Sequence, residues 1–304
     1  MAKSRDILTQ QRTESHMYES YQSFASVYDE FMDGTDYQLT ADKIRGILLK
    51  YGPSKPAGLR TGESEARDVL LAAEKNLVVD LGCGTGKLTE ILTDMGFDVM
   101  GIDLSEEMLS IALERRDKLR HKTLYLCQDM RDFELYGTAG SFVSVGDSVN
   151  YLLTDEDMDR MFRRVNTFLY PGGIFVFDFK TLHLYRDVIG DSTIAEDRED
   201  CSFIWENWFD NDTRINEYDL SLFIRDRESG ENVFHKYQEI HRQRGYTLEE
   251  MKKYVSDAGL MWIEEMDSDT MGPVTPDTER ILCVVREKDK KVPASMKKEN
   301  TDDH

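Results

Sequence analysis

Three glycines and an acid stand close together in the stretch VVDLGCGTGKLTEIL, residues 78–92. The glycines are Gly82, Gly84 and Gly86, and the acid is Asp80 at the end of an apolar run. Glycine lets the backbone adopt left-handed conformations and lets a ligand approach it closely. A turn of this kind between a strand and a helix is typical of a nucleotide-binding site, and the surrounding residues decide which ligand it holds.

Two phosphate-binding signatures are only half matched. A P-loop has Gly, four residues, and then Gly-Lys-Ser/Thr, whereas Leu81 stands at the first glycine position and Leu88 follows Lys87. A dinucleotide turn, G-x-G-x-x-G, requires glycine at position 87. Asp80 would repel a pyrophosphate but could accept a hydrogen bond from an ammonium group. The turn therefore predicts a ligand with adenosine at one end and a zwitterionic amino acid at the other, which is S-adenosylmethionine.

Two more acids follow apolar runs. Asp103 ends the second predicted strand, where an acid reaches the ribose hydroxyls in dinucleotide folds. Asp129 ends the third, where its carboxylate could accept from an adenine amino group while the Met130 amide donates to the ring. Because the carboxyl ends of parallel strands meet at one sheet edge, these acids should lie near Asp80. The simpler alternatives are a ligand-free turn for the glycines and helix capping for Asp103 and Asp129.

The segments DLGCGTG, GIDLSEEML, CQDM and FLYPGGIFVFD resemble, in order and spacing, the motifs of class I S-adenosylmethionine-dependent methyltransferases, over about residues 18–286. The resemblance implies S-adenosylmethionine as cofactor and S-adenosylhomocysteine as its product. Within these motifs Cys83 and Leu104 join the predicted cofactor site, although a small filler is the simpler role for Cys83.

Two further segments enter through the resemblance. FASVYDEFM is similar to the amino-terminal helix that covers the cofactor in small-molecule members, which implies that Tyr28 lies near the methionine end. GDSVNYL is similar to the segment after the fourth strand, which implies that Asp147, Ser148 and Asn150 lie beside cofactor and substrate. Core packing remains the alternative for Tyr28, and a turn remains the alternative for Asp147 and Asn150.

An open α/β sheet is needed to position these residues. Apolar runs alternate with helical patterns, which predicts a doubly wound, mainly parallel seven-stranded sheet with helices on both faces. The helix starts carry caps at Ser105 and Thr154 and a capping box at Thr247 and Glu250. The predicted strands cover residues 77–81, 98–104, 123–129, 141–147, 174–179, 260–265 and 279–285.

An antiparallel β insertion interrupts the pattern after the fifth strand. Tyr218, Leu220, Leu222 and Ile224 alternate with polar residues, as in a half-buried strand. We expect this insertion to be a substrate cap or a dimer surface. The predicted organisation is a helical cap and insertion at 1–75, a cofactor-binding core at 76–200, the β insertion at 201–245, core completion at 246–286 and a disordered tail at 287–304.

Candidates for a general base are harder to read than the cofactor site, because methyl transfer from a sulfonium depends mainly on alignment and exclusion of water. His235, Tyr237 and His241 share one face if their strand runs unbroken at period two, and Asp147 is the fourth candidate. Exposed strand residues of these types are also common without any catalytic role.

Composition limits the partners. The net charge of -21 opposes binding to nucleic acid. The four cysteines are scattered, no metal motif is present, and no run is long enough to span a membrane, so we predict a cytoplasmic protein without metal.

The predicted reaction is methyl transfer to a nitrogen or oxygen of a small polar molecule, since the insertion resembles that of bacterial amino-sugar N-methyltransferases and glycine/sarcosine-type enzymes. The sequence lacks an Asn-Pro-Pro-Tyr motif, and this absence argues against a nucleobase or glutamine substrate. A homodimer through the insertion is a further expectation. Two alternatives remain: a cofactor-binding module without turnover, and an NAD-dependent oxidoreductase.

Overall fold

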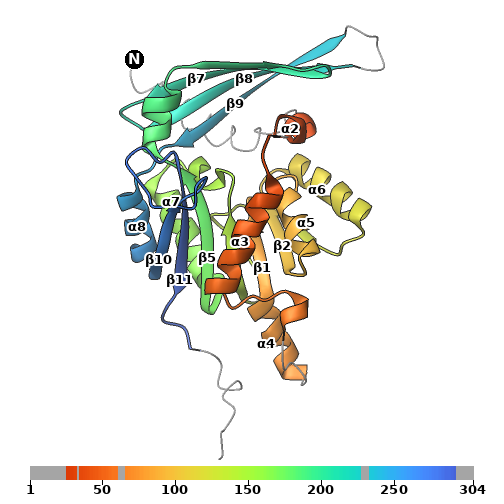
Figure 1. Ribbon diagram of the computed structural model, residues 1–304, viewed down its shortest axis with the longest axis vertical. Coiled ribbons are helices and arrows are strands. Elements are labelled where there is room, and N and C mark those ends of the chain that lie inside the picture. Colours follow the sequence, from red (N-terminus) through yellow and green to blue (C-terminus); the bar gives the residue numbers. More distant parts are fainter. Residues whose placement is uncertain (1–24, 33, 61–65, 227–232, 292–304) are drawn as a thin grey trace, which may run out of the picture.

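The computed structural model describes residues 25–32, 34–60, 66–226 and 233–291. Its centre is a seven-stranded sheet in the order β10-β11-β5-β4-β1-β2-β3 (Figure 1). All pairs from β3 to β5 are parallel, whereas β11 runs antiparallel to β5 and to β10, so the predicted mainly parallel sheet is confirmed. The strands are β1 (Leu77–Leu81), β2 (Asp98–Asp103), β3 (Leu124–Cys127), β4 (Ala139–Ser144), β5 (Leu169–Lys180), β10 (Leu260–Asp267) and β11 (Arg280–Glu287).

Helices cover both faces of this sheet, as predicted. One core cluster joins the sheet to α7 and α8, and a second joins its other face to α3 and α5. Burial of these two apolar layers supplies the main stabilisation of the fold. The helices are α2 (Ala25–Phe31), α3 (Tyr37–Tyr51), α4 (Ala66–Asn76), α5 (Lys87–Asp94), α6 (Glu106–Leu119), α7 (Asp155–Phe168) and α8 (Leu248–Asp257), with short turns η1 (Ala57–Leu59), η2 (Ser148–Tyr151) and η3 (Leu184–Ile189).

The predicted helix caps are present. Ser105 accepts a hydrogen bond from the amide of Met108, Thr154 caps α7 in the same way, and Thr247 and Glu250 form the capping box of α8. These side chains satisfy amides that have no partner inside the first helical turn. The local sequence therefore predicted where these helices begin.

The insertion forms a separate antiparallel sheet, ordered β6-β7-β8-β9, above the carboxyl edge of the central sheet (Figure 1). Its strands are β6 (Thr193–Asp197), β7 (Cys201–Asp210), β8 (Ile215–Arg225) and β9 (Phe234–Arg244). The insertion starts at Thr193 rather than at the predicted residue 201. β6 is a short, polar and largely exposed edge strand, so it carries no apolar alternation that would reveal it.

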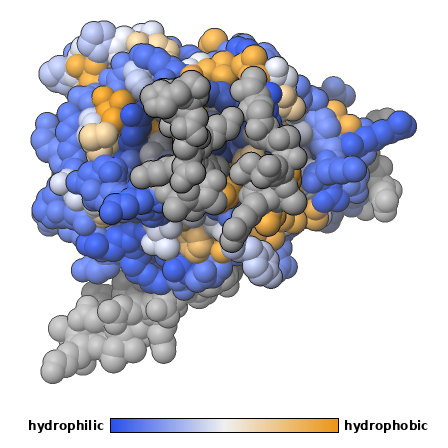
Figure 2. Space-filling view, turned by 90° about the horizontal axis from the view of Figure 1, so that it is seen from below, coloured by the Kyte–Doolittle hydropathy of each residue, from blue (hydrophilic) through white to orange (hydrophobic). Residues whose placement is uncertain are grey.

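The inner face of this second sheet is apolar and packs against α2. Leu220 and Leu222 alternate with more exposed residues on β8, as predicted, and they form a small core with Phe203 and Val27. The insertion and α2 therefore close over the same edge of the central sheet. The opposite end of the molecule, viewed from below, is mainly hydrophilic, and apolar side chains form small separate groups on it (Figure 2).

Parts of two predicted segments lie outside the described residues. The amino-terminal aromatic positions Met17, Tyr21 and Phe24 and the start of the charged helix at Glu63 belong to them. The predicted tail is described as far as residue 291, and this part contacts the core. The Lys290 ammonium donates to the carbonyls of Asn166, in the last turn of α7, and of Leu169, at the start of β5.

Candidate cofactor and acceptor site

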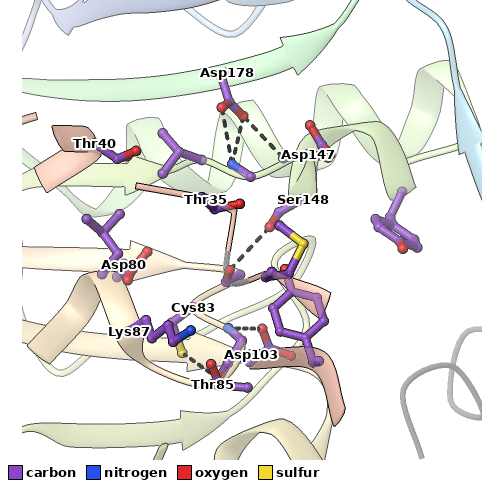
Figure 3. A pocket seen from close by; sticks show the side chains of 18 of the residues that line it. Thr35, Thr40, Asp80, Cys83, Thr85, Lys87, Asp103, Asp147, Ser148 and Asp178 are labelled. Atoms are coloured by element: carbon purple, nitrogen blue, oxygen red, sulfur yellow. Dashed lines mark hydrogen bonds between the residues drawn. The ribbon is translucent and has the colours of Figure 1, made fainter. Parts of the chain in front are cut away.

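A cavity of about 550 Å³ lies between the carboxyl edge of the central sheet and the insertion. One wall comes from the loops after β1, β2, β3 and β4, and the other from α2, α3 and the strands β7, β8 and β9. A close view shows acids from several strands directed toward this space (Figure 3). All twelve predicted cofactor-site residues except Gly86 line the cavity.

The glycine turn is held by its own backbone. Gly82, Gly84 and Gly86 have φ values of +80°, +53° and +73°, which other residues rarely adopt. The amides of Gly82 and Cys83 donate to the carbonyl of Ile102, at 2.7 and 3.0 Å. A Cβ atom at Gly82 would lie 2.5 Å from the Ser148 hydroxyl oxygen. The turn therefore needs glycine for packing as well as for its conformation.

Gly86 supports the turn from outside the cavity. A Cβ atom there would lie 2.5 Å from the hydroxyl of Tyr125, whose ring also packs against Gly101. The Tyr125 hydroxyl donates to the buried carboxylate of Glu90, at 2.6 Å. Cys83 also lines the cavity, and its sulfur lies beside Gly101, as expected of a small filler.

Asp80 and Asp103 are buried acids on the cavity wall. The Thr89 hydroxyl donates to Asp80 at 2.5 Å, but burial dominates and raises the pKa of Asp80 to about 7. The amides of Gly84 and Ser105 donate to the two Asp103 oxygens, at 2.7 and 2.9 Å. Burial raises the pKa of Asp103 despite these bonds. A bound cation would favour the ionised forms of both.

Asp129 lines the cavity with Met130, two residues beyond the end of β3. Its carboxylate already accepts several hydrogen bonds from Arg131, including one from the backbone amide at 2.8 Å. Partial burial opposes ionisation, but the hydrogen bonds and charge of Arg131 outweigh it and lower the pKa of Asp129. Sequence reasoning missed Arg131, which is adjacent to the motif and could have been weighed as a partner.

The helix α2 is fastened across the glycine turn. Tyr28 lines the cavity, as predicted. The neighbouring Asp29 accepts a hydrogen bond from the Thr85 hydroxyl at 2.9 Å, pairs with Lys87 at 3.4 Å, and forms a close ion pair with Arg115. These contacts join α2 to the turn and to α6, so they hold Tyr28 over the site.

Asp147, one of the predicted general bases, is paired with two cations. Its carboxylate pairs with the Lys180 ammonium at 2.7 Å and with the Arg280 guanidinium at 2.6 Å. Burial would raise its pKa, but the charges of Lys180 and Arg280 outweigh burial and lower the pKa of Asp147. The residue has a φ of +74° and lines the cavity, so its role is to hold these cations at the wall.

Asp178 was missed by the sequence analysis. It lies near the end of β5, and its carboxylate accepts hydrogen bonds from the amides of Gly146 and Asp147, at 3.0 and 3.2 Å (Figure 3). Burial raises the pKa of Asp178 to about 6. The rule that identified Asp103, an acid at the carboxyl end of a strand, applies equally to IFVFDF and could have found it.

Ser148 lines the cavity, whereas Asn150 does not. Ser148 donates to the Gly82 carbonyl at 3.2 Å. Asn150 is fully buried away from the cavity, which corrects its predicted place beside the substrate. Its amide donates to the carbonyls of Lys180 and Arg244, at 3.0 and 2.8 Å, and accepts from the Lys180 amide. It joins β5 to β9, and both of its amide N–H groups are used in doing so.

His235, Tyr237 and His241 share one face of β9, as the alternation predicted, but only His241 reaches the cavity. His235 and Tyr237 lie farther along the strand and are exposed, and His235 pairs with Asp226 at 3.0 Å. The structure does not bring these two predicted catalytic residues to the cavity, because the insertion sheet projects beyond the body of the molecule (Figure 1).

The roof contains Gln243 and Tyr185, which the sequence analysis did not assign. Gln243 accepts hydrogen bonds from the hydroxyls of Tyr185 and Tyr218, both at 2.7 Å. Trp205 and Leu220 complete this wall. These residues come from separate strands and from η3, so no local motif marks them.

Among the described residues there is no group of His, Cys, Asp and Glu that could hold a metal ion, and no helix there has the length and apolarity to span a membrane.

Comparison with known proteins agrees with this geometry. The family model described as a methyltransferase domain matches residues 78–173. The chain is 35% identical over 243 residues to YqeM of Bacillus subtilis strain 168, a protein named as a methyltransferase, covering 79% of this chain and 86% of YqeM. A similar protein of Geobacillus sp. strain WCH70 is 26% identical over 88% of this chain and 99% of that protein.

A solved structure of an S-adenosylmethionine-dependent methyltransferase from Clostridium acetobutylicum superposes with a TM-score of 0.73 and 27% identity, covering 88% of this chain and 99% of that one. A sugar N,N-dimethyltransferase of Streptomyces venezuelae is 32% identical, over 51% of this chain and 56% of its own length. Motif order, sheet topology and these relatives agree, and the chain belongs to the class I S-adenosylmethionine-dependent methyltransferases.

Proposed function

We propose that the protein transfers a methyl group from S-adenosylmethionine to a nitrogen or oxygen of a small polar molecule and releases S-adenosylhomocysteine. The observation that carries this proposal is the two-walled cavity. Its lower wall is the glycine turn with Asp80 and Asp103, and its upper wall is the insertion with Trp205 and Tyr218. A cavity of about 550 Å³ is within the usual range for small-molecule sites.

The lower wall fits the cofactor. A Cβ atom at Gly84 would meet nothing within 4 Å, so the backbone there borders open space. Burial keeps the pKa of Asp80 near 7, and an ammonium group beside it would favour its ionised form. Asp103 would hold the ribose hydroxyls, and Tyr28 would close over the amino-acid end. When bound, the cofactor supplies a methyl group activated by a sulfonium.

A small acceptor is supported by the shape of the site and by its relatives. The insertion and α2 roof the cavity, which leaves room for a compact molecule beside the cofactor. The Streptomyces venezuelae relative is named as acting on a nucleotide-linked amino sugar. The net charge of -21 opposes a nucleic-acid substrate.

Calorimetry with S-adenosylhomocysteine and with NAD on the full-length protein separates the main alternatives. We expect binding of the first and none of the second; the reverse would establish the oxidoreductase alternative. Incubation with methyl-labelled S-adenosylmethionine and a cell extract then tests turnover. Label in the small-molecule fraction supports the proposal, label only in RNA or protein overturns it, and binding without any label identifies a module without turnover.

Two further expectations accompany the proposal. We propose a cytoplasmic enzyme that forms a homodimer through the insertion, whose outer face carries the exposed Ile204 and Trp208. Sedimentation equilibrium of the wild type and of Trp208→Glu tests the dimer. A wild-type monomer at micromolar concentration contradicts it.

A further inference from the structure

We infer that the methyl acceptor is an amine and that its proton leaves through a relay formed by Tyr151, His241 and Glu239. This inference deepens the proposed function and rests on it. The relay belongs to two elements that are distant in sequence. Tyr151 ends η2 after β4, whereas His241 and Glu239 lie on β9 of the insertion.

His241 has a polar neighbour near each ring nitrogen. Nδ1 lies 3.3 Å from the Tyr151 hydroxyl, and Nε2 lies 3.2 Å from a carboxylate oxygen of Glu239. His241 is 4% exposed and Glu239 is 7% exposed. Nδ1 is placed to accept from the Tyr151 hydroxyl, and the Glu239 carboxylate lies at ion-pair distance from Nε2, where it can balance a protonated ring. Tyr151 and His241 both line the cavity, and Glu239 lies behind them.

The cavity wall carries more acids than bases. Seven acids line it against four lysine and arginine side chains, and Asp129 is paired with Arg131 outside this set, which leaves two acids in excess in the space that cofactor and acceptor share. An excess of negative charge in a confined site attracts a cation more than a neutral alcohol or an anion. The acids are Asp36, Asp80, Asp103, Asp129, Asp147, Asp178 and Asp269, and the bases are Lys43, Lys87, Lys180 and Arg280.

Aromatic rings converge on the same space from several elements. Tyrosines from α2, α3, η2 and β8 line the cavity, and Trp205 adds an indole from β7. Aromatic faces attract ammonium groups, most strongly where water is excluded. The acidic excess and the rings both favour an acceptor that arrives as an ammonium. The tyrosines are Tyr28, Tyr37, Tyr151 and Tyr218.

An ammonium has no lone pair with which to attack a methyl group, so a proton must be removed first. Asp147 is a poor recipient, because two cations hold its carboxylate and lower its pKa. His241 is the one histidine among the described residues that line the cavity. It is therefore the group best suited to take the proton.

The proton leaves the ammonium in two linked transfers. One N–H bond of the ammonium breaks, its electron pair stays on nitrogen, and the proton passes to the Tyr151 oxygen while the hydroxyl proton of Tyr151 passes to Nδ1 of His241. The imidazolium is then balanced by the Glu239 carboxylate. The nitrogen lone pair is now available, and the relay returns its proton to solvent after product leaves.

The test compares two probe sets on the full-length protein saturated with S-adenosylhomocysteine. The amine set is ethanolamine, glucosamine and putrescine, and the hydroxyl set is ethylene glycol, glucose and 1,4-butanediol. Histidine-ring NMR signals report binding, and the His241 signal is assigned by its loss in His241→Asn. Methyl-labelled S-adenosylmethionine then reports turnover with each set. We expect the amine set to shift the His241 signal and to take label, and the hydroxyl set to do neither.

Variants separate catalysis from folding. Tyr151→Phe and His241→Ala should each lower turnover about 100-fold, the usual scale for a general base, and leave S-adenosylhomocysteine affinity within about twofold. Added imidazole should partly restore His241→Ala, which loss of folding would not allow. If His241→Ala does not bind S-adenosylhomocysteine, His241→Asn replaces it. His235→Ala is the matched control, since His235 lies on the same face of the same strand outside the cavity.

Several results would overturn the inference. They are label or signal shifts from the hydroxyl set, normal turnover in Tyr151→Phe and His241→Ala, and no response to either set by a protein that binds S-adenosylhomocysteine. A protein that does not bind S-adenosylhomocysteine overturns the proposed function itself, and the inference with it. The two failures are therefore distinguishable.

Discussion

The two walls of the cavity are built in different ways. In the lower wall, each contact joins residues close in sequence or on adjacent parallel strands, such as Gly84 with Asp103 and Asp80 with Thr89. In the roof, contacts join distant segments, such as Tyr151 with His241, which are 90 positions apart. The lower wall is a motif that any chain with this topology can carry. The roof exists only when the insertion folds back over the sheet.

This difference separates a general task from a specific one. The lower wall fits a cofactor that the whole family shares, and its turn is fixed by glycines and backbone hydrogen bonds. The roof carries Trp205, Tyr218 and His241, whose types a different insertion could change without disturbing the turn. Substitutions in the lower wall should therefore change cofactor affinity, and substitutions in the roof should change which acceptor is methylated.

The largest expected effect is in the glycine turn. Gly82→Ala places a Cβ atom 2.5 Å from the Ser148 hydroxyl oxygen, at a φ of +80°. Left-handed strain and overpacking together cost about 2 to 5 kcal/mol, so S-adenosylhomocysteine affinity by calorimetry should fall more than about 30-fold. Gly46→Ala is the control, because its Cβ meets nothing within 4 Å on the exposed face of α3. Unchanged affinity in Gly82→Ala would show that the turn can move aside.

The next effect is on stability and pH. Burial raises the pKa of Asp80 from 3.8 to about 7, so between about pH 4 and pH 7 the folded state binds more protons than the unfolded state. The free energy of unfolding therefore decreases as pH rises through this window. In Asp80→Asn this contribution is absent. Urea titrations should show similar stability at pH 4 and an advantage of about 2 to 4 kcal/mol for the variant above pH 7.

A constant difference between Asp80→Asn and the wild type across this pH range would contradict the raised pKa. Asp98→Asn serves as the control, since Asp98 lies at the exposed start of β2, far from the carboxyl edge. The experiment sharpens the comparison of the walls because it measures how much stability the cofactor wall loses in the absence of a cation.

A smaller loss of affinity is expected at Asp103. Asp103→Ala removes a buried carboxylate from the cavity wall and two hydrogen bonds that hold Gly84 and Ser105. S-adenosylhomocysteine binding should weaken by about 1.5 to 3 kcal/mol, the scale of hydrogen bonds to a charged group. Calorimetry on a folded variant is the measurement. An unaltered affinity would rule out the ribose assignment.

The smallest effect on cofactor binding is expected in the roof. Trp205→Leu should change S-adenosylhomocysteine affinity by less than about twofold, while methylation of the amine probes falls, because indole contacts are lost on the acceptor side. Trp208→Leu is the control, since Trp208 is 59% exposed on the opposite face of β7. A large loss of cofactor affinity in Trp205→Leu would break the distinction between the two walls.

Much of the lower wall was predictable because its signals are local. The glycine spacing, the acids Asp80 and Asp103, and the caps at Ser105 and Thr154 each follow from neighbours in sequence. The same local reasoning misjudged Asn150, since a polar residue after a strand suits a ligand contact and a buried bridge between strands equally well. It also missed Asp178, although its position obeys the rule applied to Asp103.

In the insertion, alternation placed His235, Tyr237 and His241 on one face, and the register confirms this. Alternation of side chains along a strand shows which residues share a face of the sheet, but it does not show which part of that face lies over the cavity. That depends on how far the sheet projects and how it packs on α2.

The order of the core strands and helices, the glycine turn and the acids at the sheet edge could be read from the amino-acid sequence, because they depend on near neighbours and on the shared carboxyl edge of parallel strands. The contacts between residues across the cavity are visible only in the folded structure. Asp147 forms ion pairs with Lys180 and Arg280, and His241 lies against Tyr151 and Glu239. Pairing between distant segments depends on how whole elements pack, and side-chain types alone do not encode it.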